Sequence, residues 1–268
     1  MEDPRTFEWS NFDCWGLIAA GCLSPTTRKL LSSAAPDTYQ SPDWPQALEA
    51  LFDTEAQYES LVGEFSEEFF STMRAVRVFH CTRTRSVESF RANGIRAIDL
   101  EQRLHGLFVL LREPLPSLTH ADIMEAARKT FPTDGPRENT VYVGVDVRFL
   151  MDYCGHYLLY GSEGVLAVVR QLESTLGQEL AHHLRKEGTP TVVEIDLPVG
   201  ALERSDQQGL AREALYTYAY NTFHRTREVR ALDYGLCLHD GVPPEWIFGF
   251  QHPTEIRDPF SGHEGRVL

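Results

Sequence analysis

The sequence predicts an α+β protein with a helical N-terminal part followed by a mixed body of strands and helices. Over residues 44–73, large apolar side chains recur at mostly helical spacing. After residue 75, short runs rich in β-branched and aromatic residues alternate with helical stretches. The chain has 268 residues, 42% of them hydrophobic, which is enough to form a substantial core. We therefore expect a helical extension over residues 1–75 and a larger domain over residues 76–268.

The N-terminal part is predicted to contain one long helical run from Trp44 to Met73. Asp43 is suited to cap this run, because a polar residue before a proline near the first turn is typical of a helix start. The stretch from Ser24 to Ser41 is rich in Ser, Thr and Pro, which indicates a loop or linker.

The first strand of the larger domain is expected at Arg77–Cys81, followed by a short helix over Ser86–Ala92. Ser86 is suited to cap this helix, and Gly94 is suited to end it. Several prolines then surround a single helical patch at His120–Thr130. We interpret residues 100–139, approximately, as an insertion between core elements.

The rest of the chain alternates between helical and strand patterns. The predicted elements are a β-rich run at Thr140–Val145, helical stretches at Arg148–Tyr160 and Gly164–Arg185, a strand at Thr191–Leu197, a helical or mixed stretch at Leu210–Asn221, and strands at Glu228–Leu238 and Trp246–Phe250.

Composition excludes several classes of protein. The net charge is −14, so a broad phosphate-binding surface is not expected, and the charge is best interpreted as favouring solubility. No apolar run approaches the roughly 18–20 residues of a membrane span. The acidic start of the chain lacks the basic residues of a secretory signal. We therefore expect an intracellular, cytoplasmic protein with no membrane partner.

The cysteines and histidines do not predict a metal site. The five cysteines are scattered and form no Cys-x-x-Cys pair, which indicates reduced thiols rather than zinc ligands or disulfides. The adjacent pair His182 and His183 lacks a third ligand at useful spacing. We expect no metal cofactor.

The chemistry is predicted to begin at residues 78–84, which read Val-Phe-His-Cys-Thr-Arg-Thr and precede a Gly-Ile-Arg run at 94–96. A lone His at a strand end is usually structural. This block, however, resembles the first catalytic element of the ADP-ribosyltransferases. In the poly(ADP-ribose) polymerase branch, a strand ending in His-Gly-Ser/Thr-Arg leads to a helix and then to Gly-Leu/Ile. The resemblance implies a split antiparallel β-sheet core that binds NAD without a Rossmann domain.

The resemblance also implies roles for His80 and its neighbours. His80 is expected to bond a ribose hydroxyl of NAD, while the backbone around Cys81 holds the nicotinamide amide. Thr82 and Arg83 complete this NAD-binding block. Cys81 stands where the family usually has Gly. Cys can replace Gly at this position only if the backbone φ angle there is negative.

Tyr142 is the second candidate. Its run, Val-Tyr-Val-Gly at 141–144, resembles the family's Ile/Val-Tyr-Phe-Ala strand, and Tyr153 follows eleven residues later. The two family tyrosines sandwich the nicotinamide ring, a contact that suits the π-face of Tyr. Tyr157 and Tyr160 compete with Tyr153 for the second position. Without the resemblance, a Tyr in a β-rich run is most often packing.

Glu228 is the third candidate, in a run (227–233) that resembles the family's Asn-Glu-Tyr-x-Val-Tyr-Asp strand. The family glutamate stabilises positive charge that develops on the ribose as nicotinamide leaves, and a fixed anion is suited to that task. Glu194 is the fallback. Thr226 stands where the arginine-specific branch has a second Glu, so arginine is not the expected acceptor.

Together these residues predict an ADP-ribosyltransferase of the His-Tyr-Glu type that uses NAD as substrate. Its acceptor is a protein or a nucleic acid, and neither the acceptor nor the oligomeric state can be named from the sequence. Two alternatives remain open. One is an NAD glycohydrolase, in which water is the acceptor, and the other is a catalytically silent NAD- or ADP-ribose-binding module.

Overall fold

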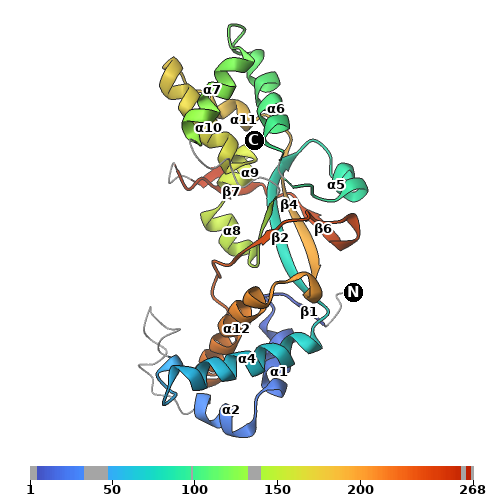
Figure 1. Ribbon diagram of the computed structural model, residues 1–268, viewed down its shortest axis with the longest axis vertical. Helices are drawn as coiled ribbons and strands as arrows, with labels where there is room; N and C mark the ends of the chain where they lie inside the picture. Colours follow the sequence, from blue (N-terminus) through green and yellow to red (C-terminus); the bar gives the residue numbers. More distant parts are fainter. Residues whose placement is uncertain (1–4, 33–47, 98, 132–139, 261–263, 267–268) are drawn as a thin grey trace. The chain divides into compact units, whose positions relative to one another are not determined.

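The computed structural model describes residues 5–32, 48–97, 99–131, 140–260 and 264–266. The protein is α+β, as predicted, and its main sheet has the strand order β5-β3-β2-β4-β6, with β1 beside β2 (Figure 1). The pairs β2–β3, β3–β5 and β4–β6 are antiparallel, and β1 runs parallel to β2. The strands are β1 (Thr6–Phe7), β2 (Ala75–Thr84), β3 (Val141–Gly144), β4 (Thr189–Pro198), β5 (Gly235–Leu238) and β6 (Ile247–Gln251).

The chain divides into two compact units. The first contains residues 1–77 and 196–234, and the second contains residues 78–195 and 235–268. This division differs from the predicted one, because residues 196–234 join the N-terminal part instead of the larger domain. Two of the boundaries fall within β2 and β4, and the third lies directly before β5.

The first unit is a group of helices around an aromatic core. Its main helices are α1 (Phe12–Cys22), α2 (Pro25–Ser32), α4 (Glu55–Thr72) and α12 (Arg204–His224), followed in Figure 1 from blue to orange; a short 3-10 turn, η2 (Val199–Ala201), precedes α12. Helix α4 confirms the later part of the predicted helical run, and Thr54 caps it by accepting from the amide of Gln57. The predicted start at Asp43 lies outside the described residues.

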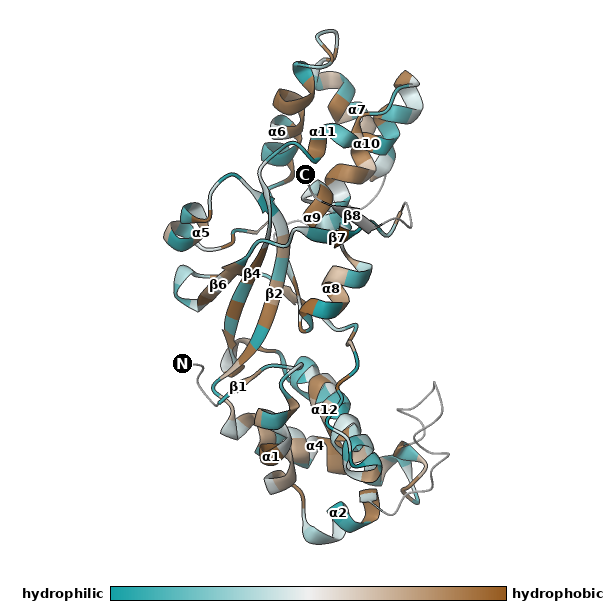
Figure 2. Cartoon of the chain, turned by 180° about the vertical axis from the view of Figure 1, so that it is seen from behind, coloured by the Kyte–Doolittle hydropathy of each residue, from teal (hydrophilic) through white to brown (hydrophobic). Residues whose placement is uncertain are grey.

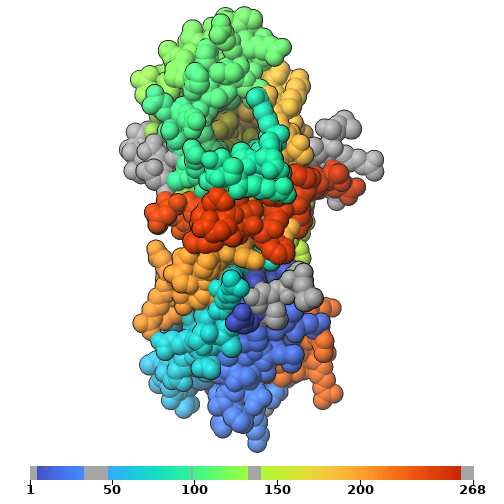
Figure 3. Space-filling view, turned by 90° about the vertical axis from the view of Figure 1, so that its right-hand side faces the viewer, coloured from blue at the N-terminus to red at the C-terminus, as the bar shows by residue number. Residues whose placement is uncertain are grey.

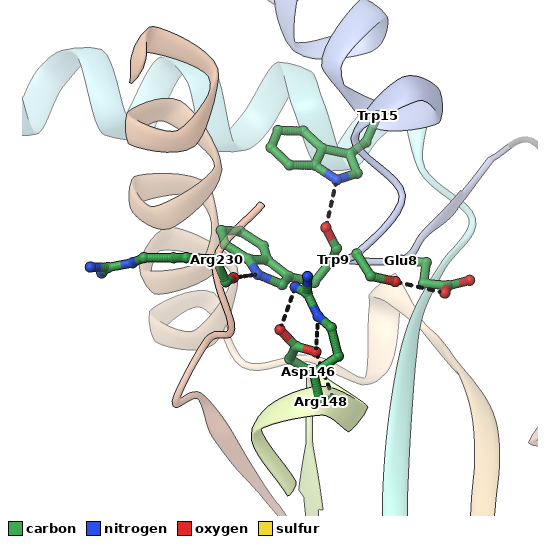
Figure 4. Close-up of polar contacts among 7 residues, drawn as sticks. Glu8, Trp9, Trp15, Asp146, Arg148 and Arg230 are labelled. Atoms are coloured by element: carbon green, nitrogen blue, oxygen red, sulfur yellow. Dashed lines mark hydrogen bonds and ion pairs between the residues drawn. The ribbon is translucent and has the colours of Figure 1, made fainter. Parts of the chain in front are cut away.

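Trp9 and Trp15 pack in the core of the first unit and bond its backbone (Figure 4). The rings of Trp9 and Trp15 stack with centroids 5.7 Å apart, and both side chains are almost fully buried. Trp15 Nε1 donates to the carbonyl of Trp9, and Trp9 Nε1 donates to the carbonyl of Arg230. A buried indole therefore has its N–H satisfied and also anchors a distant segment.

That anchored segment corrects one prediction. The strand expected at Glu228–Leu238 is wrong over most of its length, because only Gly235–Leu238 forms a strand. In the preceding residues, Val229 and Leu232 are the buried apolar side chains, a spacing that does not alternate. The carbonyl of Arg230 bonds the Trp9 indole. The side-chain pattern of this segment is therefore not that of a strand.

The second unit combines most of the sheet strands with several helices (Figure 1). Its helices are α5 (Glu88–Asn93), α6 (Leu100–Arg112), α7 (His120–Thr130), α8 (Val147–Tyr153), α9 (His156–Tyr160), α10 (Glu163–Leu176) and α11 (Ala181–Leu184), with a 3-10 turn η3 (Pro244–Trp246) and a hairpin of β7 (Glu255–Arg257) and β8 (Glu264–Arg266). Helices α6, α7 and α10 contact one another and share one hydrophobic cluster. Figure 2 shows brown, hydrophobic stretches on these helices.

Several predicted elements are confirmed, and two predicted helices are broken. Helix α7 has the predicted bounds, whereas α6 was not predicted. The stretch Arg148–Tyr160 breaks at Gly155, where an added Cβ would lie 2.0 Å from the Arg257 carbonyl. The stretch Gly164–Arg185 breaks at Gly177, whose φ of +69° ends α10 in a left-handed turn.

Candidate functional site

His80 and Tyr142 lie together on neighbouring strands. The antiparallel register pairs Phe79 with Gly144, which sets His80 on β2 beside the Tyr142 end of β3. The Nδ1 atom of His80 lies 2.8 Å from the carbonyl oxygen of Tyr142. Because a carbonyl only accepts, Nδ1 must carry the proton, and Nε2 of a neutral ring is left as an acceptor.

The charge state of His80 supports that tautomer. Burial lowers the pKa of His80 below its usual 6.5, and the nearby Arg103 guanidinium lowers it further, against the opposing effect of the Tyr142 carbonyl. The ring is therefore neutral at pH 7. Because Nδ1 of His80 donates to the Tyr142 carbonyl, Nε2 can accept a hydrogen bond from a hydroxyl group.

Two adjoining cavities lie at this site within the second unit. The larger, about 620 Å³, contains His80 among its lining residues, and the smaller, about 340 Å³, contains Tyr142 and Tyr157. In Figure 3 a hollow opens among the teal and green atoms of this unit. Arg103, Ser162 and Val165 line both cavities, so the two spaces adjoin at these residues. Both volumes fall in the range of small-molecule sites.

Arg83 shapes the larger cavity. Its guanidinium donates to four backbone carbonyls, those of Leu158, Arg185, Glu187 and Gly188, at 2.5–2.9 Å. These bonds fasten the end of β2 to α9 and to the loop before β4. The structure therefore gives Arg83 a positioning role, and its guanidinium is committed to the backbone.

Cys81 and Thr82 are both buried beside His80. Among the described residues Arg225 is the only non-glycine with positive φ, so the backbone of Cys81 has the ordinary, negative φ of a non-glycine residue. Burial raises the pKa of the Cys81 thiol to about 12, which keeps it protonated and unreactive. Thr82 lines the larger cavity.

The three competing tyrosines have different surroundings. Tyr157 shares the smaller cavity with Tyr142, and its hydroxyl donates to Glu163 at 3.1 Å. Tyr153 is 58% exposed and stacks on Phe149. The hydroxyl of Tyr160 donates to Asp258 and accepts from Arg185. Tyr157 is therefore the one of these three tyrosines that lines the same cavity as Tyr142.

Glu228 lies in the first unit, away from any strand, and its side chain is exposed. Its amide bonds the hydroxyl of Thr226. The fallback, Glu194, lies on β4 in the second unit and accepts from Gln251 at 2.8 Å. Neither glutamate lines the two cavities. The strand context that suggested Glu228 is therefore absent.

The sequence analysis gave no role to several residues that line the cavities, and three of them are polar residues at or beside the border that the two cavities share. Arg103 comes from α6, which was not predicted, and Ser162 and Glu163 begin α10. The run Gly-Ser-Glu-Gly at 161–164 lacks the spacing of a nucleophile elbow, so it suggested no role. A serine directly before a helical pattern is a sequence signal for a helix start, and it could have pointed to Ser162. In the structure Ser162 caps α10 by accepting from the amide of Val165.

Comparison of the chain with family models, with curated proteins and with solved structures finds no match. Within the described ranges, no group of three or more His, Cys, Asp or Glu side chains is placed to hold a metal ion. No helix of the described part has both the length and the apolarity to cross a bilayer.

Proposed function

We propose that this protein is an ADP-ribosyltransferase that binds NAD in the two adjoining cavities and transfers ADP-ribose to a protein or nucleic-acid acceptor. The observation that carries this proposal is the bond from His80 to the Tyr142 carbonyl. The family resemblance suggested His80, Tyr142 and Glu228. This bond links the first two, each of which lines one of the two adjoining cavities.

The groups of the site suit the parts of NAD. The free Nε2 of His80 accepts from a ribose hydroxyl. Tyr142 and Tyr157 line the smaller cavity, where their rings can stack on the flat, cationic nicotinamide. In the reaction, the bond between ribose C1′ and the nicotinamide nitrogen breaks and its electron pair leaves with nicotinamide. The acceptor then forms a bond to C1′ and loses a proton.

The developing positive charge on the ribose needs a nearby anion. Glu228 takes this role in the resemblance, and it is exposed in an irregular segment. Glu163 is the carboxylate that lines the cavity with Tyr142 and accepts from Tyr157. Replacing each with Gln removes the charge and nearly preserves the shape, so the two variants decide which carboxylate acts.

The exposed, irregular setting of Glu228 favours a second candidate, a silent module that binds NAD or ADP-ribose without cleaving it. An NAD glycohydrolase differs from the transferase only in using water as acceptor. NAD turnover measured with and without a macromolecular acceptor separates these three functions.

The test measures nicotinamide release from NAD by the full chain and by His80→Asn. Asn retains an N–H donor for the Tyr142 carbonyl and lacks the Nε2 acceptor. We expect release by the parent protein and a loss of about a hundredfold in the variant. Equal release by a folded His80→Asn protein would remove His80 from the mechanism. NAD binding without release would favour the silent module.

A further inference from the structure

Four arginines line the larger cavity, and three of them have partners. Arg83 donates to backbone carbonyls, as described above. Arg85 makes two hydrogen bonds to the Glu187 carboxylate, at 2.8 and 2.5 Å. Arg96 donates to the side-chain oxygen of Asn93 at 3.3 Å. The positive charge or the N–H groups of each are therefore engaged.

Arg103 differs from the other three. It is half-buried, and across the described ranges its guanidinium makes no hydrogen bond or ion pair, whereas its backbone amide donates to the Asp99 carbonyl within the helix. Burial lowers the pKa of its guanidinium, which shows that its charge is partly removed from water. A guanidinium that is partly removed from water and has no protein partner gains from an anionic ligand in the adjoining cavity. Arg103 lines both cavities, so such a ligand would sit where they meet.

The groups around this junction add to its preference for an anion. Ser162, which also lines both cavities, is the N-cap of the 14-residue helix α10. The first amides of a helix have no acceptor within the helix, and its dipole places partial positive charge there. The unpaired arginine and the two cavities define the anion site, and the partial positive charge at the start of α10 adds to the attraction for an anion.

We propose that Arg103 binds a diphosphate at the junction of the two cavities and that the organic groups on its two sides occupy one cavity each. A carboxylate is usually a terminal group and would leave one cavity empty, whereas a diphosphate ester links two organic groups. The guanidinium fork suits phosphate oxygens. Naming the ligand as NAD or ADP-ribose rests on the proposed function, while the anion site rests on Arg103 and the cavities alone.

The test is calorimetric titration of the full chain with ADP-ribose, adenosine and inorganic pyrophosphate. Three proteins are compared: the parent, Arg103→Gln, and Arg112→Gln. Arg112 lies on the same helix, is exposed and lines neither cavity, so its variant changes the net charge equally. We expect Arg103→Gln to weaken ADP-ribose and pyrophosphate binding by tenfold or more, on the order of a charged hydrogen bond. Arg112→Gln should change them by less than about threefold, a surface-charge effect.

The outcomes separate this proposal from the proposed function. Pyrophosphate binding that depends on Arg103, without binding of ADP-ribose, would retain the anion site and contradict the NAD-based function. Equal ADP-ribose affinity in the parent and Arg103→Gln would overturn the Arg103 site while leaving NAD binding intact. Failure of the parent to bind either compound would overturn both.

If Arg103→Gln does not fold, the salt dependence of the parent decides the question. A diphosphate held by a guanidinium should bind more weakly as salt rises, while adenosine binding should stay nearly constant. ADP-ribose affinity that does not fall with salt would contradict the proposal.

Discussion

The two units place an arginine in contrasting surroundings. In the first unit, Arg77 is 3% exposed and forms an ion pair with Asp196 at 2.6 Å. It also forms a longer ion pair with Glu8, at 4.0 Å. In the second unit, Arg103 is half-buried at the wall of two cavities and has no partner within the described residues. A paired buried cation holds a structure together, whereas an unpaired one beside a cavity is available to a ligand.

The aromatic residues show the same contrast. Trp9 and Trp15 are packed against each other, and their indole N–H groups are satisfied by backbone carbonyls. Tyr142 and Tyr157 instead border a cavity of about 340 Å³. The first unit uses its aromatic rings for stability, and the second leaves space beside them.

The largest effect is expected for Trp9→Ala. The substitution removes a ring that is 1% exposed and the hydrogen bond that anchors the segment at Arg230. It should lower the free energy of unfolding by about 3–5 kcal/mol, as large-to-small core substitutions do. Tyr153→Ala, at an exposed ring of the second unit, should change it by less than ~1 kcal/mol. Urea denaturation measures both, and similar losses would contradict the contrast.

The two arginines should respond differently to replacement by Met. Arg77→Met leaves Asp196 without its close partner, and because that carboxylate is still 30% exposed the loss should be about 2–3 kcal/mol, below the value for a fully buried pair. Arg103→Met removes an unpaired charge and should leave stability unchanged or raise it. A destabilised Arg103→Met protein would show that Arg103 serves the fold.

A glycine in each unit has a different backbone requirement. Gly94 has a φ of +69°, and an added Cβ would lie 1.9 Å from the Val242 carbonyl, so Gly94→Ala should destabilise the protein by about 1–3 kcal/mol. Gly63 lies within α4 with open space around it, so Gly63→Ala should stabilise by about 0.5–1 kcal/mol. Melting temperatures that shift in the same direction would contradict this assignment.

The smallest effect is a pH dependence that arises in the second unit. Burial lowers the pKa of both His80 and His156 below the usual 6.5, and for His156 the carboxylates of Glu163 and Asp258 oppose this shift. The unfolded chain therefore binds protons at a higher pH than the folded one. Stability should be full above pH 6.5 and fall as pH drops below that value.

His156 is suited to test this dependence, because neither ring nitrogen has a hydrogen-bond partner in the described structure. His156→Leu should melt at the same or a higher temperature at pH 7 and lose less stability between pH 7 and pH 5. An unchanged pH profile would exclude His156 as a source of the dependence.

Local patterns predicted part of this structure well. The strand that carries His80 and the turn at Gly94 follow from short runs of residues, and the bounds of α7 follow from helical spacing. The joining of α12 to the N-terminal helices depends on packing between segments more than a hundred residues apart, which no local pattern contains.

The candidate site was also predicted only in part. His80 and Tyr142 were found through family-like motifs. The role of Glu228 was inferred from the resemblance of residues 227–233 to a strand of the family, and these residues do not form a strand. The distinctive feature of Arg103 is the lack of a partner, which appears only when the folded surroundings are known.

We propose that the cavities beside His80 and Tyr142 bind NAD and support cleavage of its nicotinamide–ribose bond. The decisive measurement is nicotinamide release from NAD by the full chain, compared with a Tyr142→Ala variant whose melting temperature matches the parent. We predict release by the parent and weaker NAD binding with slower release by the variant, since a lost stacking contact is worth about 0.5–1.5 kcal/mol. A parent protein that neither binds NAD nor releases nicotinamide would contradict the claim.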